Sequence, residues 1–223
     1  IEDYFEGNSI DKSKYKRDLS VDRKLIGLEQ MLWIKNNLNK KYKWSIIGQQ
    51  VLMTQVFLPT IFANMNKKIL PAYLHKYLKI GGANVPYNTD AWDGYPKERE
   101  RLFKELKKAN SILVLTGDTH NSWLNNLYDK NNNFVGIEIG TPAISSPNTI
   151  DTFGSLTDGI EQGFIKENKN VKWTEGKHKG YTLLKLTNDK CEVSFVYVNT
   201  VKSKTYDVID TNKFKVKPNT PII

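Results

Sequence analysis

The sequence predicts an α/β protein in which helices lie against two packed sheets. Two helix–strand units come first, over 27–48 and 97–115, and two pairs of strands follow, over 124–139 and 181–198. This order is typical of layered domains, in which each element buries one apolar face against its neighbour. At 223 residues, of which 39% are hydrophobic, the chain is long enough to bury one such core.

The first helix–strand unit follows a polar start. Residues 1–22 are mostly polar and charged and are expected to form a loop. A helix is expected over 27–39, where apolar residues recur at helical spacing: Leu28, Met31, Leu32 and Leu38. The aromatic and β-branched run over 44–48 then predicts a buried strand, which ends at Gln49 and Gln50.

The second unit lies in the middle of the chain. A short amphipathic helix is expected over 70–78. After a loop, Pro96 suits the first turn of a longer helix over 97–108. The apolar run over 112–115 follows directly and predicts a buried strand.

The last part of the chain predicts two hairpins and a tail. The expected hairpins pair 124–128 with 134–139, and 181–186 with 192–198. A loop over 141–150 and a partly helical segment over 152–168 separate the two hairpins. The tail, residues 203–223, is too rich in proline to continue the interior of a sheet.

Charge and hydropathy exclude some functions. The formal net charge is +9 and the pI is about 9.3, which favours anionic partners. Because the lysines form no dense cluster, we expect no dedicated nucleic-acid surface, and the positive field suits phosphate esters equally well.

Three glutamines interrupt the apolar stretch over 45–65, so no membrane span is expected. The single Cys191 excludes an internal disulfide and is expected to be a buried, inert thiol. The sequence leaves the oligomeric state open.

The tetrapeptide Gly117-Asp118-Thr119-His120 carries the clearest chemical signal. It places a carboxylate and an imidazole two residues apart where a predicted strand stops. Such groups can reach two metal ions about 3.5–4 Å apart. An oxygen ligand beside a nitrogen ligand suits Fe, Mn, Zn or a mixed pair that includes Ca. The alternative is a strand-end turn with a capping Asp and a surface His, and the tetrapeptide alone does not decide between them.

Further motifs stand in a fixed order around this tetrapeptide. In chain order they are Leu25–Gln30, Lys43–Met53, Asp90–Pro96, Glu138–Pro147 and His178–Tyr181. From about Glu2 to about Lys202, this set resembles the C-terminal half of the PhoD-like alkaline phosphatases, a branch of the calcineurin-type metallophosphatases. The resemblance implies a four-layer αββα sandwich, with residues 1–223 forming the C-terminal portion of a single catalytic domain.

The resemblance also implies roles for the tetrapeptide. Asp118 would bind one metal ion and His120 another, with Thr119 between them pointing away. The implied metals are Fe together with Ca, with Zn or Mn as further candidates. The implied substrate is a phosphate mono- or diester.

Other residues have two interpretations each. Gln49 and Gln50 either bind a metal ion or its water, or satisfy backbone groups in a crowded loop. Asp93 either supports a metal ligand or provides a negative charge at the start of a helix. His178 either lines a phosphate pocket or packs at its polar rim, and Asn121 either makes a loop hydrogen bond or contacts the site.

The implied metal site is incomplete in this sequence. The resemblance places the other ligands before Ile1, and any export signal would lie there too, since members of this family are usually exported. The leading hypothesis is therefore a metal-dependent phosphoric ester hydrolase, with this chain carrying the second ligand loop and inactive by itself. One rival hypothesis is a non-catalytic binding protein with the same fold. A nucleic-acid-binding module, the third hypothesis, depends on charge alone.

Overall fold

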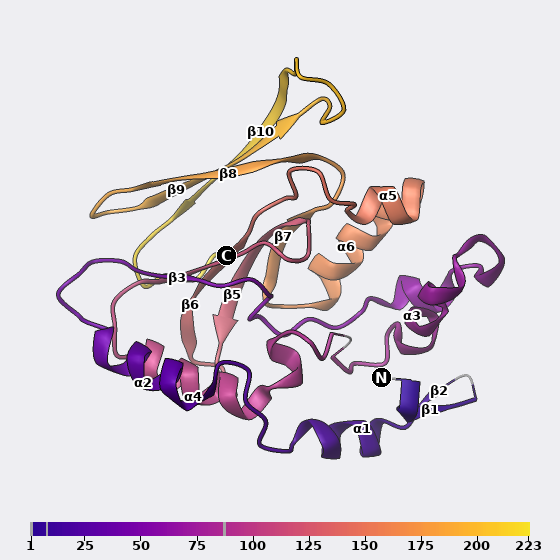
Figure 1. The fold of residues 1–223 in the computed structure, drawn as a ribbon, viewed down its shortest axis with the longest axis horizontal. Coiled ribbons are helices and arrows are strands. Elements are labelled where there is room, and N and C mark those ends of the chain that lie inside the picture. Colours follow the sequence, from indigo (N-terminus) through magenta and orange to yellow (C-terminus); the bar gives the residue numbers. More distant parts are fainter. Residues whose placement is uncertain (1, 8, 87) are drawn as a thin grey trace.

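The computed structural model describes residues 2–7, 9–86 and 88–223, and these ranges form an α/β structure with two main sheets (Figure 1). The larger sheet contains β3 (Ser45–Gly48), β4 (Ile112–Thr116), β5 (Ser122–Tyr128), β6 (Phe134–Gly140) and β7 (Val171–Glu175). Its order is β3-β4-β6-β5-β7. The smaller sheet contains β8 (Lys179–Leu186), β9 (Cys191–Val198) and β10 (Val208–Val216), in the order β10-β9-β8.

In the described ranges, six α-helices accompany the sheets: α1 (Lys12–Leu19), α2 (Gly27–Asn37), α3 (His75–Ile80), α4 (Pro96–Leu106), α5 (Thr149–Phe153) and α6 (Thr157–Glu167). Short 3-10 turns cover Glu2–Tyr4, Thr60–Asn64, Lys67–Ile69, Ala72–Leu74, Trp92–Gly94 and Gly154–Leu156. A two-residue pair, β1 (Phe5–Glu6) with β2 (Ser9–Ile10), lies near the start of the chain. The expected helix over 70–78 is therefore a 3-10 turn followed by α3.

The two faces of the larger sheet have different neighbours, as strand alternation requires. On β4, Ile112 and Val114 pack with α4 residues in one buried cluster. The alternate residue Leu113 packs with β9 in another cluster, which joins the two sheets. Helices α2 and α4, the larger sheet and the smaller sheet thus form three successive layers (Figure 1). The fold confirms the predicted layered α/β class.

A third apolar cluster closes one side of the molecule. It brings α1, α3 and α6 together with β5 and β7, around Phe62, Trp123 and Phe164. Trp123 and Phe164 meet edge to face, with ring centroids 5.3 Å apart. This cluster lies directly beneath the loop that follows β4, so it gives that loop a rigid support.

The expectation of a loop over 1–22 is wrong for the described residues; residues 1 and 8 lie outside them. Asp11 caps the start of helix α1, and its side chain accepts hydrogen bonds from the N–H groups of Ser13 and Lys14. Tyr15 and Leu19, one turn apart, are both buried. The Tyr15 hydroxyl donates to the Pro86 carbonyl, a partner that is 71 residues away in the sequence. This distant burial explains why a largely polar segment is helical.

The expected tail over 203–223 also contains regular structure. Strand β10 pairs antiparallel with β9 along its length, and Val216 is buried against the inter-sheet cluster. The prolines at 218 and 221 come after the strand has ended. Because β10 is an edge strand, it needs only one hydrogen-bonded neighbour.

Two simpler expectations have clear outcomes. Cys191 is fully buried, as expected, and burial raises the pKa of its thiol to about 11. No helix among the described residues has both the length and the apolar character needed to cross a bilayer.

The inter-sheet cluster predicts a large cost for truncating Phe195. Its side chain is fully buried and packs against Trp173 and Phe214. Phe195→Ala is expected to lower the free energy of unfolding by about 3–5 kcal/mol, because it removes buried contacts and leaves a cavity. Denaturant unfolding measures this effect, with Leu183→Ala as the control, since Leu183 is 55% exposed on β8. Equal losses in both variants would contradict the packing described.

Candidate functional site

The ends of four strands meet at one edge of the larger sheet. Strands β3 and β6 run parallel to β4, while β5 runs antiparallel to both β6 and β7. The carboxyl ends of β3, β4, β6 and β7 therefore share this edge, which we call the sheet rim. In such sheets ligands bind at the carboxyl ends of the strands. The segments that leave the four strands there are 49–50, 117–120, 141–147 and 176–178.

Backbone bonds hold the 117–120 loop against the end of β3. The carbonyl of Gln50 accepts from the N–H of Gly117 at 3.1 Å and from the N–H of Asp118 at 2.9 Å. Inside the loop, His120 N–H donates to the Gly117 carbonyl at 3.1 Å. The Thr119 hydroxyl accepts from the indole of Trp123 at 2.8 Å, so Thr119 is directed toward the core. This loop is thus fixed at several points.

His120 adopts an unusual backbone conformation. Its φ is +62°, in the left-handed region, which costs a non-glycine residue about 1–2 kcal/mol. Strained backbone of this kind occurs often at functional sites, although it does not by itself identify one.

The imidazole of His120 has a defined tautomer. Its Nδ1 lies 2.9 Å from the carbonyl oxygen of Pro147. Because a carbonyl oxygen only accepts, Nδ1 carries the proton of the neutral ring, and in that tautomer Nε2 has the lone pair. This arrangement is typical of metal-binding histidines, in which the second nitrogen is held by an acceptor. The sequence did not reveal this acceptor, since Pro147 is 27 residues away.

The carboxylate of Asp118 is exposed at the sheet rim. Within the described residues it has no recorded hydrogen bond or ion pair. It lines a hollow of about 250 Å³ together with Asn88, Thr119, Asn121 and Trp123. An unpaired carboxylate on a rigid loop is free to bind a cation.

Among the other candidate residues, Gln49 and Asn121 already make side-chain hydrogen bonds, whereas Gln50 is exposed. Gln49 uses both ends of its amide, accepting from the Trp92 indole at 3.0 Å and donating to the Val51 carbonyl. Asn121 likewise donates to the Thr149 hydroxyl at 2.8 Å and accepts from the Thr149 N–H at 3.2 Å. These contacts agree with the structural interpretation of both residues. The side chain of Gln50, by contrast, is exposed.

His178 lies at the end of β7 and is half-buried. Its Nδ1 is 2.8 Å from Glu175 Oε1, and its ring lies on Tyr197, with centroids 5.2 Å apart. The loop that contains Pro147 is close, since Asn148 donates to the His178 carbonyl at 3.2 Å. His178 therefore belongs to the sheet rim, oriented by an acidic partner.

Asp93 has a role that the sequence did not suggest. It is buried and forms an ion pair with Arg99 at 2.6 Å, while its second oxygen accepts from the Val56 N–H at 3.0 Å. Arg99 also donates to the Met53 carbonyl at 3.2 Å. Asp93 thus anchors the chain that follows β3, instead of supporting a metal ligand or beginning helix α4.

Glu138 is a second buried acid, and its structural role was not predicted from the sequence. It accepts from Met53 N–H at 2.5 Å, from Thr54 N–H at 3.2 Å and from the Asn125 amide at 2.9 Å. Together Asp93, Arg99, Asn125 and Glu138 form what we call the buried polar cluster. It satisfies the backbone over 53–56, which would otherwise lose its hydrogen bonds on burial.

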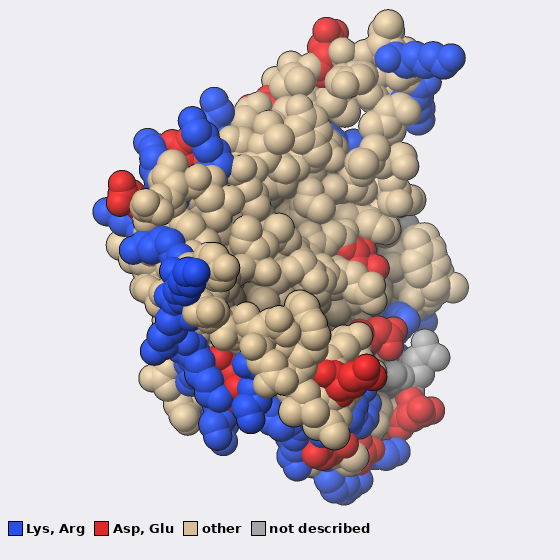
Figure 2. All heavy atoms as spheres, turned by 60° about the vertical axis from the view of Figure 1, so that its left-hand side comes forward, with Lys and Arg blue, Asp and Glu red and all other residues tan. Residues whose placement is uncertain are grey.

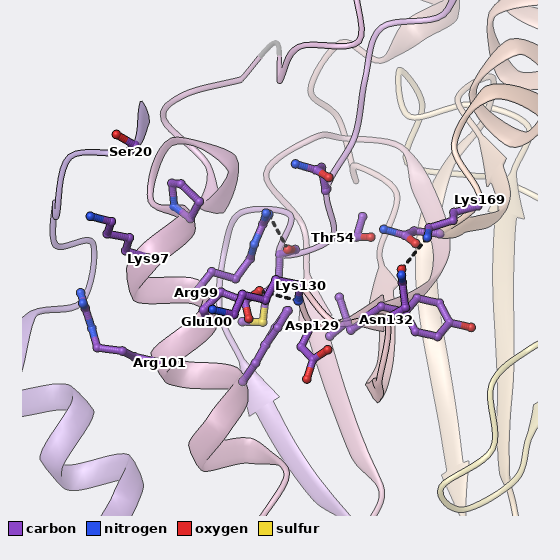
Figure 3. Close-up of a pocket in the computed structure, with 17 residues that line it drawn as sticks. Ser20, Thr54, Lys97, Arg99, Glu100, Arg101, Asp129, Lys130, Asn132 and Lys169 are labelled. Atoms are coloured by element: carbon purple, nitrogen blue, oxygen red, sulfur yellow. Dashed lines mark hydrogen bonds between the residues drawn. The ribbon is translucent and has the colours of Figure 1, made fainter. Parts of the chain in front are cut away.

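A larger cavity, of about 630 Å³, opens elsewhere, between α4 and the turn that joins β5 to β6 (Figure 3). That turn lies at the opposite end of the sheet from the 117–120 loop. Positively charged side chains line the cavity, but Figure 3 shows Lys97 and Arg101 on one side and Lys169 on the other. Arg101 is already paired with Asp22 at 2.6 Å. These charges do not converge on one point, so the cavity is a weaker candidate than the sheet rim.

The donors at the sheet rim suit a metal ion only in part. Asp118 offers a free carboxylate and His120 a free ring nitrogen, as a metal site requires. However, no group of three or more His, Cys, Asp or Glu residues gathers anywhere in the described ranges. Catalytic metal ions commonly have three protein ligands, so further donors would be needed.

Known proteins of one family resemble this chain. The family model for the PhoD-like phosphatases matches residues 4–195. Alkaline phosphatase D of Bacillus subtilis (strain 168) is 33% identical over 189 residues, which are 81% of this chain and 28% of that protein. A solved structure described as "Structure of PhoD" has a TM-score of 0.65 at 24% identity, covering 90% of this chain and 34% of that chain. At this identity the structural likeness shows the fold alone. The chain therefore spans about a third or less of the length of these relatives.

The buried polar cluster predicts that stability depends on pH. Burial raises the pKa of Glu138 from 4.5 to about 7, so the folded chain binds this proton more tightly than the unfolded chain. The resulting stabilisation is complete below about pH 4.5 and is lost as the pH rises to 7, a change of about 3 kcal/mol. Denaturant unfolding between pH 5 and 8 should show this decline.

Two variants test the assignment to Glu138. Glu138→Gln should remove this part of the pH dependence, whatever its effect on stability at one pH. Glu192→Gln is the control, because the pKa of Glu192 is lowered by Lys190 and its carboxylate stays ionised in this range. An unchanged slope in Glu138→Gln would assign the titration to another group.

Proposed function

Because this chain belongs to the PhoD-like phosphatase family, we propose that it is the C-terminal portion of one metallophosphatase catalytic domain, which hydrolyses phosphate mono- or diesters. Residues 117–120 would provide one of the ligand loops of its metal site. The chain covers 28% of the length of alkaline phosphatase D, so the activity proposed is that of the whole protein.

One observation supports this proposal most directly. The 117–120 loop presents a free carboxylate and an imidazole whose Nδ1 is tied to a carbonyl, on a rim where strand ends converge. We propose that Asp118 binds one metal ion and His120 a second one through Nε2. Iron together with calcium would suit these donors, and zinc or manganese would also fit.

Bound metal ions would supply positive charge for the phosphoryl group and activate a water molecule. This chain's own residues would orient and support the site. The Gln50 carbonyl fixes the loop, and the buried polar cluster fixes the chain that follows Gln50. Of the candidate residues named from the sequence, Gln50 and His178 would contact substrate at the rim, whereas Gln49 and Asn121 would act through the contacts they already make.

The charge of the chain is compatible with this substrate class. A net charge of +9 produces a positive field that attracts phosphate esters. We further propose, from the family resemblance alone, that the protein is exported. A domain without catalysis remains the competing function, and the lack of a three-donor cluster in the described ranges favours it for the isolated chain.

Substitution of the two proposed ligands tests the function. In the complete gene product, Asp118→Asn and His120→Ala should each lower kcat on aryl phosphate mono- or diesters by about 100-fold or more, because each removes charge stabilisation of the transition state. A chelator should abolish wild-type activity, and re-addition of metal should restore it. Bound metal, measured by elemental analysis, should fall in both variants.

Matched controls are available elsewhere in the chain. Asp189→Asn changes an exposed carboxylate at a hairpin turn, and His75→Ala changes a histidine that contacts only the carbonyls of Lys67 and Leu70 in the described structure. Both should keep wild-type rates and metal content. Full activity and metal content in Asp118→Asn and His120→Ala would remove the ligand assignment.

A further inference from the structure

We propose that the end of the molecule opposite the sheet rim binds the surface of a lipid bilayer that contains anionic headgroups. We call this end the sheet base, and it consists of residues 39–44, 107–111, 129–133, 168–170, 185–192 and 215–219. Binding there would turn the sheet rim away from the bilayer. The inference goes beyond the proposed function, because it concerns where the protein is held and not what it hydrolyses.

The larger sheet brings several of these segments to one end. Strands β3, β4 and β6 are parallel and all begin at the end opposite the sheet rim, while antiparallel β5 ends there. The turn after α4 is joined to the loop before β3 by the Asn110 amide, which donates to the Lys40 carbonyl at 2.7 Å. It is joined to the β5–β6 turn by the ion pair of Lys107 with Asp129, at 2.5 Å. The loops at this end therefore form one connected surface.

The smaller sheet contributes its own turn to the same surface. The Trp44 indole, just before β3, donates to the Thr187 carbonyl in the β8–β9 turn at 2.6 Å. The side chain of Asn219, after β10, accepts from the N–H of Ser111 at 2.7 Å. In Figure 1 the β8–β9 turn and the loop that leads into β3 both lie at the left. Both sheets thus end at the sheet base.

The sheet base is rich in lysine, and most of its acids are neutralised. Asp129 is paired with Lys107, and Glu192 is paired with Lys190 at 2.6 Å, which leaves Asp189 as the remaining acid in these segments. The exposed lysines of the sheet base that have no recorded ion pair in the described residues are Lys40, Lys41, Lys43, Lys130, Lys169, Lys185, Lys215 and Lys217. The sheet base therefore has a large excess of positive charge.

This excess is a product of the fold, because the lysines come from distant parts of the sequence. Their field is visible at Glu192, whose pKa is lowered by Lys190 and, to a smaller degree, by Lys185 and Lys215. Figure 2 shows Lys and Arg gathered along the left margin and the lower part of the view, beside a broad uncharged surface. At the sheet rim, by contrast, the charged residues of the four segments are Asp118 and Lys177, and Lys177 is paired with Asp158.

The kind of side chain at the sheet base favours a bilayer as the partner. Its segments contain no arginine, the residue suited to bidentate recognition of nucleic-acid bases and phosphates. Tyr42 stands between two of the lysines and is 61% exposed, and it shares a hollow of about 200 Å³ with Trp33, which is 66% exposed. Exposed Tyr and Trp beside lysines are typical of the bilayer interface, where the rings lie at the headgroup level.

The shape of the sheet base agrees with a broad partner. Its lysines lie on several turns and loops at one end of two sheets, and they do not surround a single point. One phosphate group would contact few of them, whereas a bilayer surface would attract all of them at once. Each lysine near an anionic bilayer contributes to binding, so their number determines the affinity.

Vesicle co-sedimentation of the complete gene product tests the proposal. The protein should bind vesicles of phosphatidylcholine that contain about 30% phosphatidylglycerol, and it should not bind vesicles of phosphatidylcholine alone. Raising the salt concentration from about 0.1 M to about 0.5 M should release it, because salt screens exposed charges. No binding to the anionic vesicles, or equal binding to both kinds, would overturn the proposal.

A triple variant tests the position of the site. Replacing Lys40, Lys41 and Lys43 together by Gln should weaken binding to the anionic vesicles by about 100-fold, since each lysine adds to the attraction. All three side chains are exposed, so the circular dichroism spectrum and the melting temperature should not change. Unchanged vesicle binding in this variant would remove the assignment to the sheet base.

A matched triple variant controls for net charge. Replacing Lys67, Lys202 and Lys204 together by Gln removes the same charge from exposed positions outside the sheet base. This variant should bind the anionic vesicles nearly as well as the wild-type protein. Equal weakening in the two triple variants would mean that net charge alone causes binding, and it would overturn the proposal.

Linear inorganic polyphosphate separates a bilayer from a soluble polyanion. Tyr42→Ala should weaken binding to the anionic vesicles several-fold and leave binding to polyphosphate unchanged, because only a bilayer interface accommodates the ring. A protein that binds polyphosphate through the sheet base but does not bind the vesicles would have a site for soluble polyanions, and the bilayer proposal would be wrong.

The outcome is independent of the proposed function, because vesicle binding is measured without turnover. Asp118→Asn should bind the anionic vesicles as the wild-type protein does, even where its phosphatase activity is lost. Vesicle binding by a protein without chelator-sensitive activity would disprove the function and keep the bilayer site. Chelator-sensitive activity without vesicle binding would do the reverse.

Discussion

The carbonyl of Gln50 is the contact on which the sheet rim depends. By accepting from both Gly117 and Asp118, it joins the ends of two parallel strands and fixes the start of the loop that carries His120. Without this contact the loop would rely on the Thr119–Trp123 bond, on the contacts of His120 with Ala143 and Pro147, and on local turns. The carboxylate and the imidazole are therefore positioned in large part by main-chain pairing.

The segment after Gln50 is fixed by hydrogen bonds to the buried polar cluster. Placing two acids and an arginine in the core has a desolvation cost, which their mutual contacts and the hydrogen bonds to 53–56 offset. The segment over 53–56 cannot shift without breaking hydrogen bonds to these buried charged groups. The cluster thus contributes rigidity near the site more clearly than it contributes net stability.

Local patterns were enough to predict much of this structure. The strand at 112–115, the helix that follows Pro96 and both hairpins have strong periodicity and turn residues, and all of them are present. Helix α1 and strand β10 were missed because their apolar partners are distant: Tyr15 reaches Pro86, and Val216 packs between the sheets. The apolar spacing in α2 predicted a helix correctly, but Leu28 and Leu32 face outward instead of toward the core.

Fewer of the contacts at the sheet rim could be predicted. The motif predicted that Asp118 and His120 act together, and this stays a prediction, whereas no local signal linked His120 to Pro147 or Asp93 to Arg99. Glu138 lies in an apolar strand, where one acid gives no hint that it organises a neighbouring loop. Contacts of this type depend on which strand ends the topology brings together, and a single sequence does not specify that directly.

The acceptor for the His120 ring has one more consequence. Because it is a main-chain carbonyl, no single amino-acid replacement removes it, provided that the path of the chain through Pro147 is kept. Side chains in the 141–147 loop can therefore be replaced while the orientation of the His120 ring stays the same.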